Sequence, residues 1–226
     1  MPIEQVVTVS LPRSGSVSLP RSGSAGVWDA LIAAGRSLTG ATRVVLLRAE
    51  SSVLLRAEDG DFSDGAAASS SFEDSFDEPP TAAVDWLRRP DVISIASMSG
   101  RVAGAGFDAA LACDLRVVSD DAQLTPSRSA SGLLRLGELM GYSRALEFVV
   151  TGAVISGRQA VAAGLANLSV GPDMLDATVA KMIEGVLRTP REVATVAKAV
   201  LQEPGADRRR LADDLALGIA LAANEA

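Results

Sequence analysis

The sequence contains no histidine. Catalysis by a Ser-His-Asp or Cys-His set, zinc binding through an HExxH helix and any histidine general base are therefore excluded. Acid–base chemistry near neutral pH must instead use aspartate, glutamate, tyrosine, lysine, cysteine or bound water. Any reactive site in this chain is thus built without imidazole.

Cysteine occurs once, as Cys113, which rules out an internal disulfide and a cysteine-based zinc cluster. No run reaches ~18 uninterrupted apolar residues, so no membrane-spanning helix is expected. The first ten residues lack a basic stretch followed by an apolar core, so no signal peptide is expected. A net charge of −7 disfavours nucleic acid and anionic membranes as partners. These absences predict a soluble, cytoplasmic protein.

The chain has 226 residues, of which 48% are hydrophobic. This length allows one domain with a full-sized core. The mean hydropathy of +0.25 favours a folded globule over a disordered chain.

In the first half of the chain, continuous apolar runs typical of strands alternate with segments whose apolar residues have helical spacing. Strands are predicted at 6–11, 43–47, 92–98 and 115–119, and helices at 27–38, 83–88, 144–151, 156–163, 175–187, 190–202 and 208–224. Ser156 is a predicted N-cap, and Gly152 and Gly164 are predicted helix stops. Strands alternating with helices, followed by helices alone, indicate an α/β fold with a helical C-terminal part.

Two octad repeats interrupt this pattern. VSLPRSGS at 9–16 is repeated at 17–24, and VLLRAE at 45–50 recurs at 53–58. Two perfect copies do not indicate a solenoid, which needs several diverged copies. They are either a local expansion of the chain or an error in the recorded sequence. We predict that at least one copy lies outside regular strand pairing.

Three small residues, Gly104, Ala105 and Gly106, follow the predicted strand 92–98 and precede an acid, Asp108. A strand, a tight turn and a helix start present backbone N–H groups that can hold an anion or a developing oxyanion. The alternative is a turn that needs small residues only for close packing.

Four segments resemble one known family. Residues 90–114, PDVISIASMSGRVAGAGFDAALACD, follow the pattern P-V-I-A-x-V-N-G-x-A-x-G-G-G-x-E-L-A-x-x-C-D of the enoyl-CoA hydratase/isomerase (crotonase) superfamily. AQLTPSRSASGLL at 122–134, GYSRALEFVVTGAVISGRQAVAAGLAN at 141–167 and the P-x₇-K spacing at 190–198 are similar to later motifs of that superfamily. Because the motifs occur in the family's order, the chain is identified as a divergent member.

The resemblance implies a crotonase-like α/β fold. A spiral of β-β-α units would span 1–140 and a C-terminal helical trimerisation region 141–226, within one continuous domain. It also implies a homotrimer or a dimer of trimers that binds an acyl-CoA thioester. Coenzyme A would then be part of the substrate, with no separate cofactor and no metal.

The resemblance further implies an oxyanion hole. In the family, two backbone N–H groups polarise the thioester carbonyl. The sequence FSDGA at 62–66 resembles the family motif that supplies the first of these N–H groups. The resemblance assigns this N–H group to Ala66, beside Gly65. The small-residue turn assigns the second to Ala105, between Gly104 and Gly106. Two such donors can stabilise an enolate oxygen by several kcal/mol.

The chain departs from the family at the acid–base pair. Family hydratases use two glutamates around a water, and these align with Asp108 and Arg128. Asp108 is either the sole acid/base or an acid placed favourably at a helix start. Arg128 is either a surface residue or a cation that faces Asp108 or a substrate carboxylate. Three hypotheses follow: a lyase or isomerase with an incomplete catalytic pair, a non-catalytic protein that binds acyl-CoA or a partner protein, or a purely structural subunit.

Several other residues have structural interpretations. Asp114 is predicted to be a structural residue at a strand start, and Cys113 a small buried hydrophobe. Trp28 and Trp86 are predicted to lie in the core.

Overall fold

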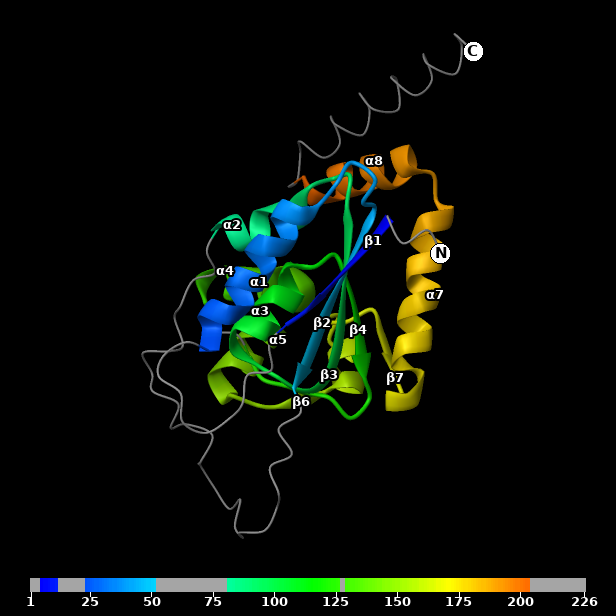
Figure 1. The fold of residues 1–226 in the computed structure, drawn as a ribbon. Coiled ribbons are helices and arrows are strands. Elements are labelled where there is room, and N and C mark those ends of the chain that lie inside the picture. The colour runs from blue at the N-terminus through cyan, green and yellow to red at the C-terminus, as the bar shows by residue number, and fades with distance from the viewer. Residues whose placement is uncertain (1–4, 12–22, 52–80, 127–128, 204–226) are drawn as a thin grey trace.

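The fold is built on a parallel sheet flanked by helices (Figure 1). The computed structural model describes residues 5–11, 23–51, 81–126 and 129–203. The strands are β1 (Val6–Ser10), β2 (Val44–Ser51), β3 (Ile93–Val102), β4 (Leu115–Ser119), β5 (Gln123–Leu124), β6 (Ile155–Ser156) and β7 (Leu168–Val170). The helices are α1 (Gly23–Ser37), α2 (Thr81–Val84), the 3₁₀-helix η4 (Asp85–Arg88), α3 (Gly104–Ala112), α4 (Ala130–Met140), α5 (Tyr142–Thr151), α6 (Gly157–Ala162), the 3₁₀-helix η5 (Pro172–Met174), α7 (Leu175–Arg188) and α8 (Arg191–Gln202).

The main sheet has the strand order β1-β2-β3-β4-β7, and all four pairings are parallel. The end of β3 leaves this sheet and pairs with β5, which pairs in turn with β6. Parallel neighbours require crossover connections, and helices supply them here. The predicted α/β class is confirmed.

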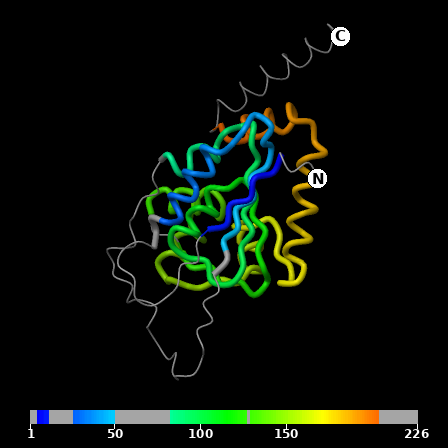
Figure 2. Tube along the Cα trace, viewed as in Figure 1, coloured from blue at the N-terminus to red at the C-terminus, as the bar shows by residue number. Residues whose placement is uncertain are grey.

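Helices cover both faces of the sheet, and Figure 2 shows α7 on the side opposite α1 and α3. One face carries Val45, Leu47 and Met98 into the larger core cluster, which includes residues of α1, α3, α4 and α5. The other face carries Val44 and other strand residues against α7, in the cluster Val44, Leu46, Ile95, Val117, Leu175, Val179 and Ile183. Burial on both faces explains why these strands read as nearly continuous apolar runs.

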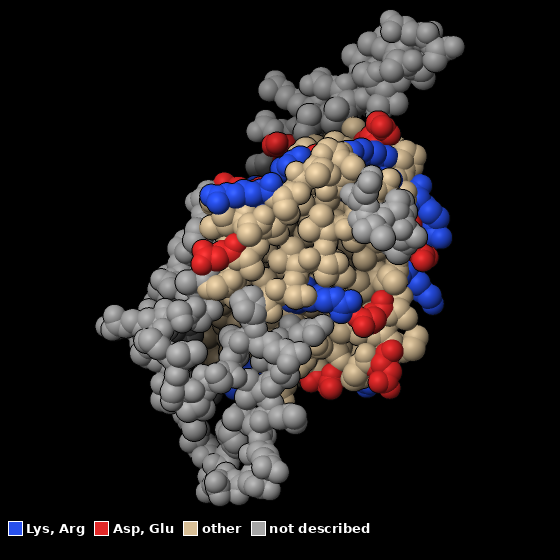
Figure 3. Space-filling view, viewed as in Figure 1, with Lys and Arg blue, Asp and Glu red and all other residues tan. Residues whose placement is uncertain are grey.

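The surface around the β1 edge is largely uncharged in Figure 3, with Lys, Arg, Asp and Glu side chains at its margins. Within the described part of the chain, none of the helices has the length and apolar character that crossing a membrane requires.

The predicted starts and ends of the helices are largely confirmed. Ser156 forms a capping box with Gln159 at the start of α6. Gly152 and Gly164 end helical segments with φ values of 62° and 80°, in the left-handed region that glycine adopts without strain. Pro190 is the N-cap of α8 rather than its first helical residue.

Two strands run further than predicted, because backbone pairing holds polar residues in the sheet. β2 continues to Ser51 and β3 to Val102, with Arg48 paired to Ser97 and Glu50 to Ser99. The sequence pattern also missed α4, whose N-cap is Ser129.

Trp28 lies in the core, as predicted, whereas Trp86 is only partly buried and packs against it. Trp28 is 5% exposed, and Trp86 is partly buried against α1. A Cβ atom at Gly35 would lie 2.6 Å from the Trp86 ring, so this contact between α1 and η4 requires glycine. The predicted boundary at 140/141 lies between α4 and α5, which pack against each other, and the division there stays a prediction.

Of the two copies of VLLRAE, 45–50 lies in β2, and 53–58 lies outside the described residues. The predicted helix at 208–224 also lies outside them. These two predictions are therefore untested.

Candidate functional site

The small-residue turn lies where β3 gives way to α3. Ala103 is extended, with φ −149° and ψ 168°, and serves as the N-cap of α3. Gly104 follows with a φ of 53°, a conformation that favours glycine. The predicted order of strand, turn and helix is confirmed at these residues.

The first N–H groups of α3 have no intrahelical acceptor, because a helix leaves its first turn unpaired. Phe107 makes the first backbone bond of the turn, donating to the Ala103 carbonyl at 3.4 Å. The N–H of Ala105 precedes it and lies at the positive end of the helix dipole. This placement is suitable for a donor to an anionic oxygen.

Asp108 lies in the second turn of α3, not in the first as predicted. It follows Gly104 by four residues, so the two share one side of the helix. The residue is only 8% exposed, and carboxylates are rarely so buried without a partner or a function. Because helix-dipole stabilisation falls off beyond the first turn, this position weakens the interpretation of Asp108 as a helix-start acid.

The end of β5 and the start of α4 lie near this turn. The Thr125 N–H donates to the Val102 carbonyl at 3.1 Å, two residues before Gly104. Ser129 then caps α4 by accepting from the Gly132 N–H, and α4 packs against α3. The hydroxyl of Thr125 is buried without a hydrogen-bond partner. Sequence reasoning gave Thr125 no role, and only its burial distinguishes it.

Three predicted site residues lie outside the described residues: Gly65, Ala66 and Arg128. The structure brings together Gly104, Ala105, Gly106 and Asp108 on α3. The segment that carries Gly65 and Ala66 connects β2 to α2. The last residue of β2 pairs with Gly100, four residues before Gly104.

Two other ionisable groups near α3 are structural. Burial raises the pKa of the Cys113 thiol to about 12, so it is protonated at neutral pH and unsuited to nucleophilic attack. Burial lowers the pKa of Arg116 to about 10, which leaves it cationic near pH 7. Its guanidinium donates to the carbonyls of Leu165 and Cys113, both at 2.6 Å.

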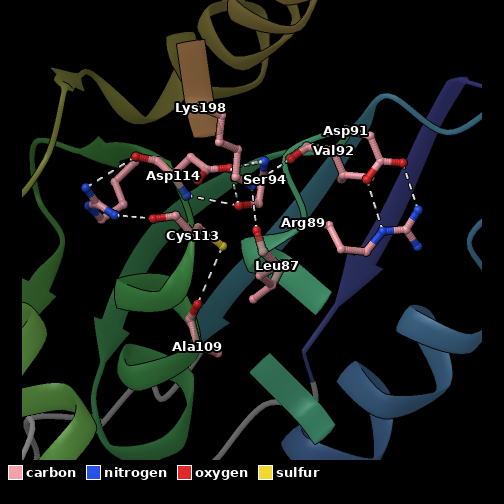
Figure 4. Close-up of polar contacts among 10 residues, drawn as sticks. Leu87, Arg89, Asp91, Val92, Ser94, Ala109, Cys113, Asp114 and Lys198 are labelled. Carbon is pink, nitrogen blue, oxygen red and sulfur yellow. Dashed lines mark hydrogen bonds and ion pairs between the residues drawn. The ribbon is translucent and has the colours of Figure 1, made fainter. Parts of the chain in front are cut away.

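A buried network at the other end of α3 joins it to α8 (Figure 4). The Lys198 ammonium donates to the Leu87 carbonyl at 2.6 Å, the Val92 carbonyl at 2.7 Å and the Asp114 carboxylate at 2.8 Å. That carboxylate also accepts from the N–H and hydroxyl of Ser94, both at 2.8 Å. The structural interpretation of Asp114 is confirmed. The P-x₇-K spacing marked Lys198 but did not reveal its partners.

A hollow of about 310 Å³ is lined by Arg88, Pro90, Ala199, Gln202 and Glu203. It adjoins the start of β3, whereas the α3 turn follows the end of this ten-residue strand, about 30 Å away. The hollow is thus separate from the α3 turn. Among the residues that the structure describes, no group of three or more acidic or cysteine side chains is placed to hold a metal ion.

Residues 40–221 match the family model described as enoyl-CoA hydratase/isomerase. The chain is 40% identical over 84 residues to enoyl-CoA hydratase domain-containing protein 2 of Bos taurus, covering 34% of this chain and 28% of that protein. It is 31% identical over 137 residues to a probable enoyl-CoA hydratase, EchA17, of Mycobacterium avium (strain 104), covering 56% of this chain and 53% of that protein. These matches span about a quarter to a half of each relative's length.

Solved structures match over most of the chain. A putative enoyl-CoA hydratase from Thermobifida fusca YX in complex with CoA superposes with a TM-score of 0.75 at 27% identity, covering 98% of this chain and 92% of that one. The acetoacetyl-CoA complex of a putative enoyl-CoA hydratase from the same organism gives 0.72 at 26% identity, covering 96% and 92%. The predicted crotonase-like fold is confirmed, and the chain belongs to the enoyl-CoA hydratase/isomerase family.

Proposed function

We propose that this chain binds an acyl-CoA thioester and stabilises its enolate. The observation that carries the proposal is the start of α3, where the Ala105 N–H lies at the helix N-terminus and the buried Asp108 lies one turn away. The Ala105 N–H, with that of Ala66, would hold the thioester oxygen. Asp108 would remove the proton from the adjacent carbon and return it. Structures of relatives with CoA and acetoacetyl-CoA support this substrate class.

One carboxylate supports a single proton transfer better than the addition of water. Hydration by a pair of carboxylates needs one of them to hold a proton near pH 7, and two close acids raise each other's proton affinity. With Arg128 in place of the second acid, this effect is absent. The same substitution favours a second candidate function, a non-catalytic protein that binds acyl-CoA or a partner protein.

Titration calorimetry with short acyl-CoAs should detect binding, while hydration of a short enoyl-CoA should be slower than in a two-carboxylate site by roughly 10²-fold or more. The hydration rate is followed by loss of the enone absorbance. Binding without any proton transfer selects the non-catalytic function. Rapid hydration contradicts the assignment of a single carboxylate. If the chain shows no binding and no turnover, the remaining hypothesis is a structural subunit.

We also propose that copies of this chain associate through α4 and α5, as a homotrimer or a dimer of trimers. Tyr142, Leu146 and Val150 recur every four residues along α5 and are 78%, 47% and 72% exposed. Leu134 on α4 is 72% exposed. Apolar side chains exposed on two helices that pack together favour burial against another protein surface.

Light scattering should give three or six times the chain mass of 23.2 kDa, and Leu146→Glu should reduce it. Leu168→Glu, at an exposed residue outside α4 and α5, is the control and should leave the mass unchanged. A wild-type mass of one chain at micromolar concentration contradicts the association.

A further inference from the structure

The repeated sequence VLLRAE bears directly on β2. Its first copy, 45–50, supplies six of the eight residues of this strand. β2 pairs with β1 on one side and with β3 on the other, so it occupies an inner position in the sheet. The second copy, 53–58, follows eight residues later.

The side chains through which the first copy contacts the core recur in the same order in the second copy. Val45, Leu47 and Ala49 are at most 4% exposed in the larger core cluster, and Leu46 is 5% exposed on the opposite face. A shift of eight residues would place an identical side chain at each of these sites. Because eight is an even number, each side chain would also keep its face of the sheet.

The two registers differ chiefly before the repeat begins. In the observed register, Val44 is fully buried and Arg43 donates to the carbonyls of Val186, Leu187 and Thr189 at the end of α7. A shift of eight would put Ser52 in place of Val44, and Ser51 in place of Arg43. The observed register is therefore favoured, but by contacts at one end of the strand rather than along its length.

The other octad repeat does not permit the same exchange in β1. A shift of eight there would replace Val6, Val7 and Thr8 by Ser14-Gly15-Ser16 over three of the five paired positions. The apolar side chains of Val6 and Val7 would be lost. Of the strands that the structure describes, only β2 has a second copy of its core-forming residues in the sequence.

We propose that β2 is a two-register strand, in which residues 53–58 can replace residues 45–50 between β1 and β3. The exchange moves eight residues from the connection after β2 to the connection before it. Because loop-closure entropy depends only weakly on loop length, this transfer changes the free-energy cost of closing the two connections little. The exchange itself is independent of the proposed function. Its consequence, a connection to Gly65 and Ala66 that is eight residues shorter, bears on that function.

Matched substitutions in the two copies test the proposal. Leu47→Asp places a carboxylate in the core of the observed register, and Leu55→Asp makes the same change in the second copy. We expect Leu47→Asp to remain folded with a lowered midpoint of thermal unfolding, because residues 53–58 replace the damaged copy. Leu55→Asp alone should unfold like the wild type. The double variant should lose the cooperative transition, as should Ile95→Asp at a fully buried position of β3 that has no second copy.

Hydrogen exchange with mass spectrometry identifies the strand in use. Protection of backbone amides should move from 45–50 in the wild type to 53–58 in Leu47→Asp. The proposal is overturned if Leu47→Asp unfolds as completely as the double variant. It is also overturned if Leu47→Asp folds with protection still at 45–50. A third contrary outcome is a wild-type mass lower than that of a chain carrying both copies of VLLRAE.

Discussion

Replacing Lys198 by methionine is expected to lower the free energy of unfolding by about 3–5 kcal/mol, the range for breaking a buried ion pair by removing one partner. The Lys198 side chain is 4% exposed, and its ammonium has three acceptors on two segments that flank β3 and α3. Methionine fills similar space but donates no hydrogen bond. Two backbone carbonyls and the Asp114 carboxylate then lose the hydrogen bonds that Lys198 donates, and the carboxylate keeps only those from Ser94 (Figure 4).

Urea unfolding of Lys198→Met, followed by circular dichroism, measures this loss. Lys181→Met on the exposed side of α7 is the matched control and should shift the free energy by at most about 0.5 kcal/mol. A loss below about 1 kcal/mol for Lys198→Met would show that water satisfies the three acceptors. The pairing with Asp114 would then contribute little to stability.

Asp108→Asn is expected to slow exchange of the α-protons of an acyl-CoA with D₂O by roughly 10²- to 10⁴-fold, the usual contribution of a positioned general base. The amide matches the carboxylate in shape but cannot take up the proton. The Ala105 N–H is unaltered by the substitution, so the proposed contact with the thioester oxygen remains. The affinity for acyl-CoA should therefore change far less than the exchange rate.

Deuterium incorporation, followed by mass spectrometry, gives the rate, and titration calorimetry gives the affinity. Asp173→Asn, at an exposed carboxylate in η5, is the matched control. Equal exchange rates in the wild type and Asp108→Asn, both above the protein-free rate, contradict a catalytic role for Asp108. A wild-type rate equal to the protein-free rate contradicts the proposed enolate chemistry and supports the non-catalytic function.

The elements with the clearest apolar patterns were the ones that sequence reasoning could place. β4 lies at 115–119 as predicted, because its side chains are buried and its ends are marked by charged residues. The extension of β2 through Arg48 and Glu50 could not be seen from hydropathy, since the pairing of β3 residues holds these polar positions in the strand. α4 was missed because its apolar residues do not keep to one face of the helix: Leu136 is buried, whereas Leu133 and Leu134 are exposed.

The candidate site was predictable to the extent that it depends on local backbone geometry. A strand followed by Gly104-Ala105-Gly106 indicated the turn and the helix start directly. The burial of Asp108 and of the Thr125 hydroxyl depends on how α3, α4 and β5 pack, which local spacing does not specify. The role of Lys198 depends on contacts with residues 84 and 111 positions away, so it also required the tertiary structure.

The parallel order of the main sheet has a consequence for the chain as it leaves the ribosome. None of the strand pairs described in it is a local hairpin, so each of these pairings must wait for a crossover to be synthesised. β7 completes the sheet only at Val170, and Lys198 follows near the end of α8. At about 5–20 residues per second, the apolar strands β1 and β2 remain without their full cover for several seconds. High contact order therefore makes slow folding and early aggregation the main hazards of biosynthesis for this protein.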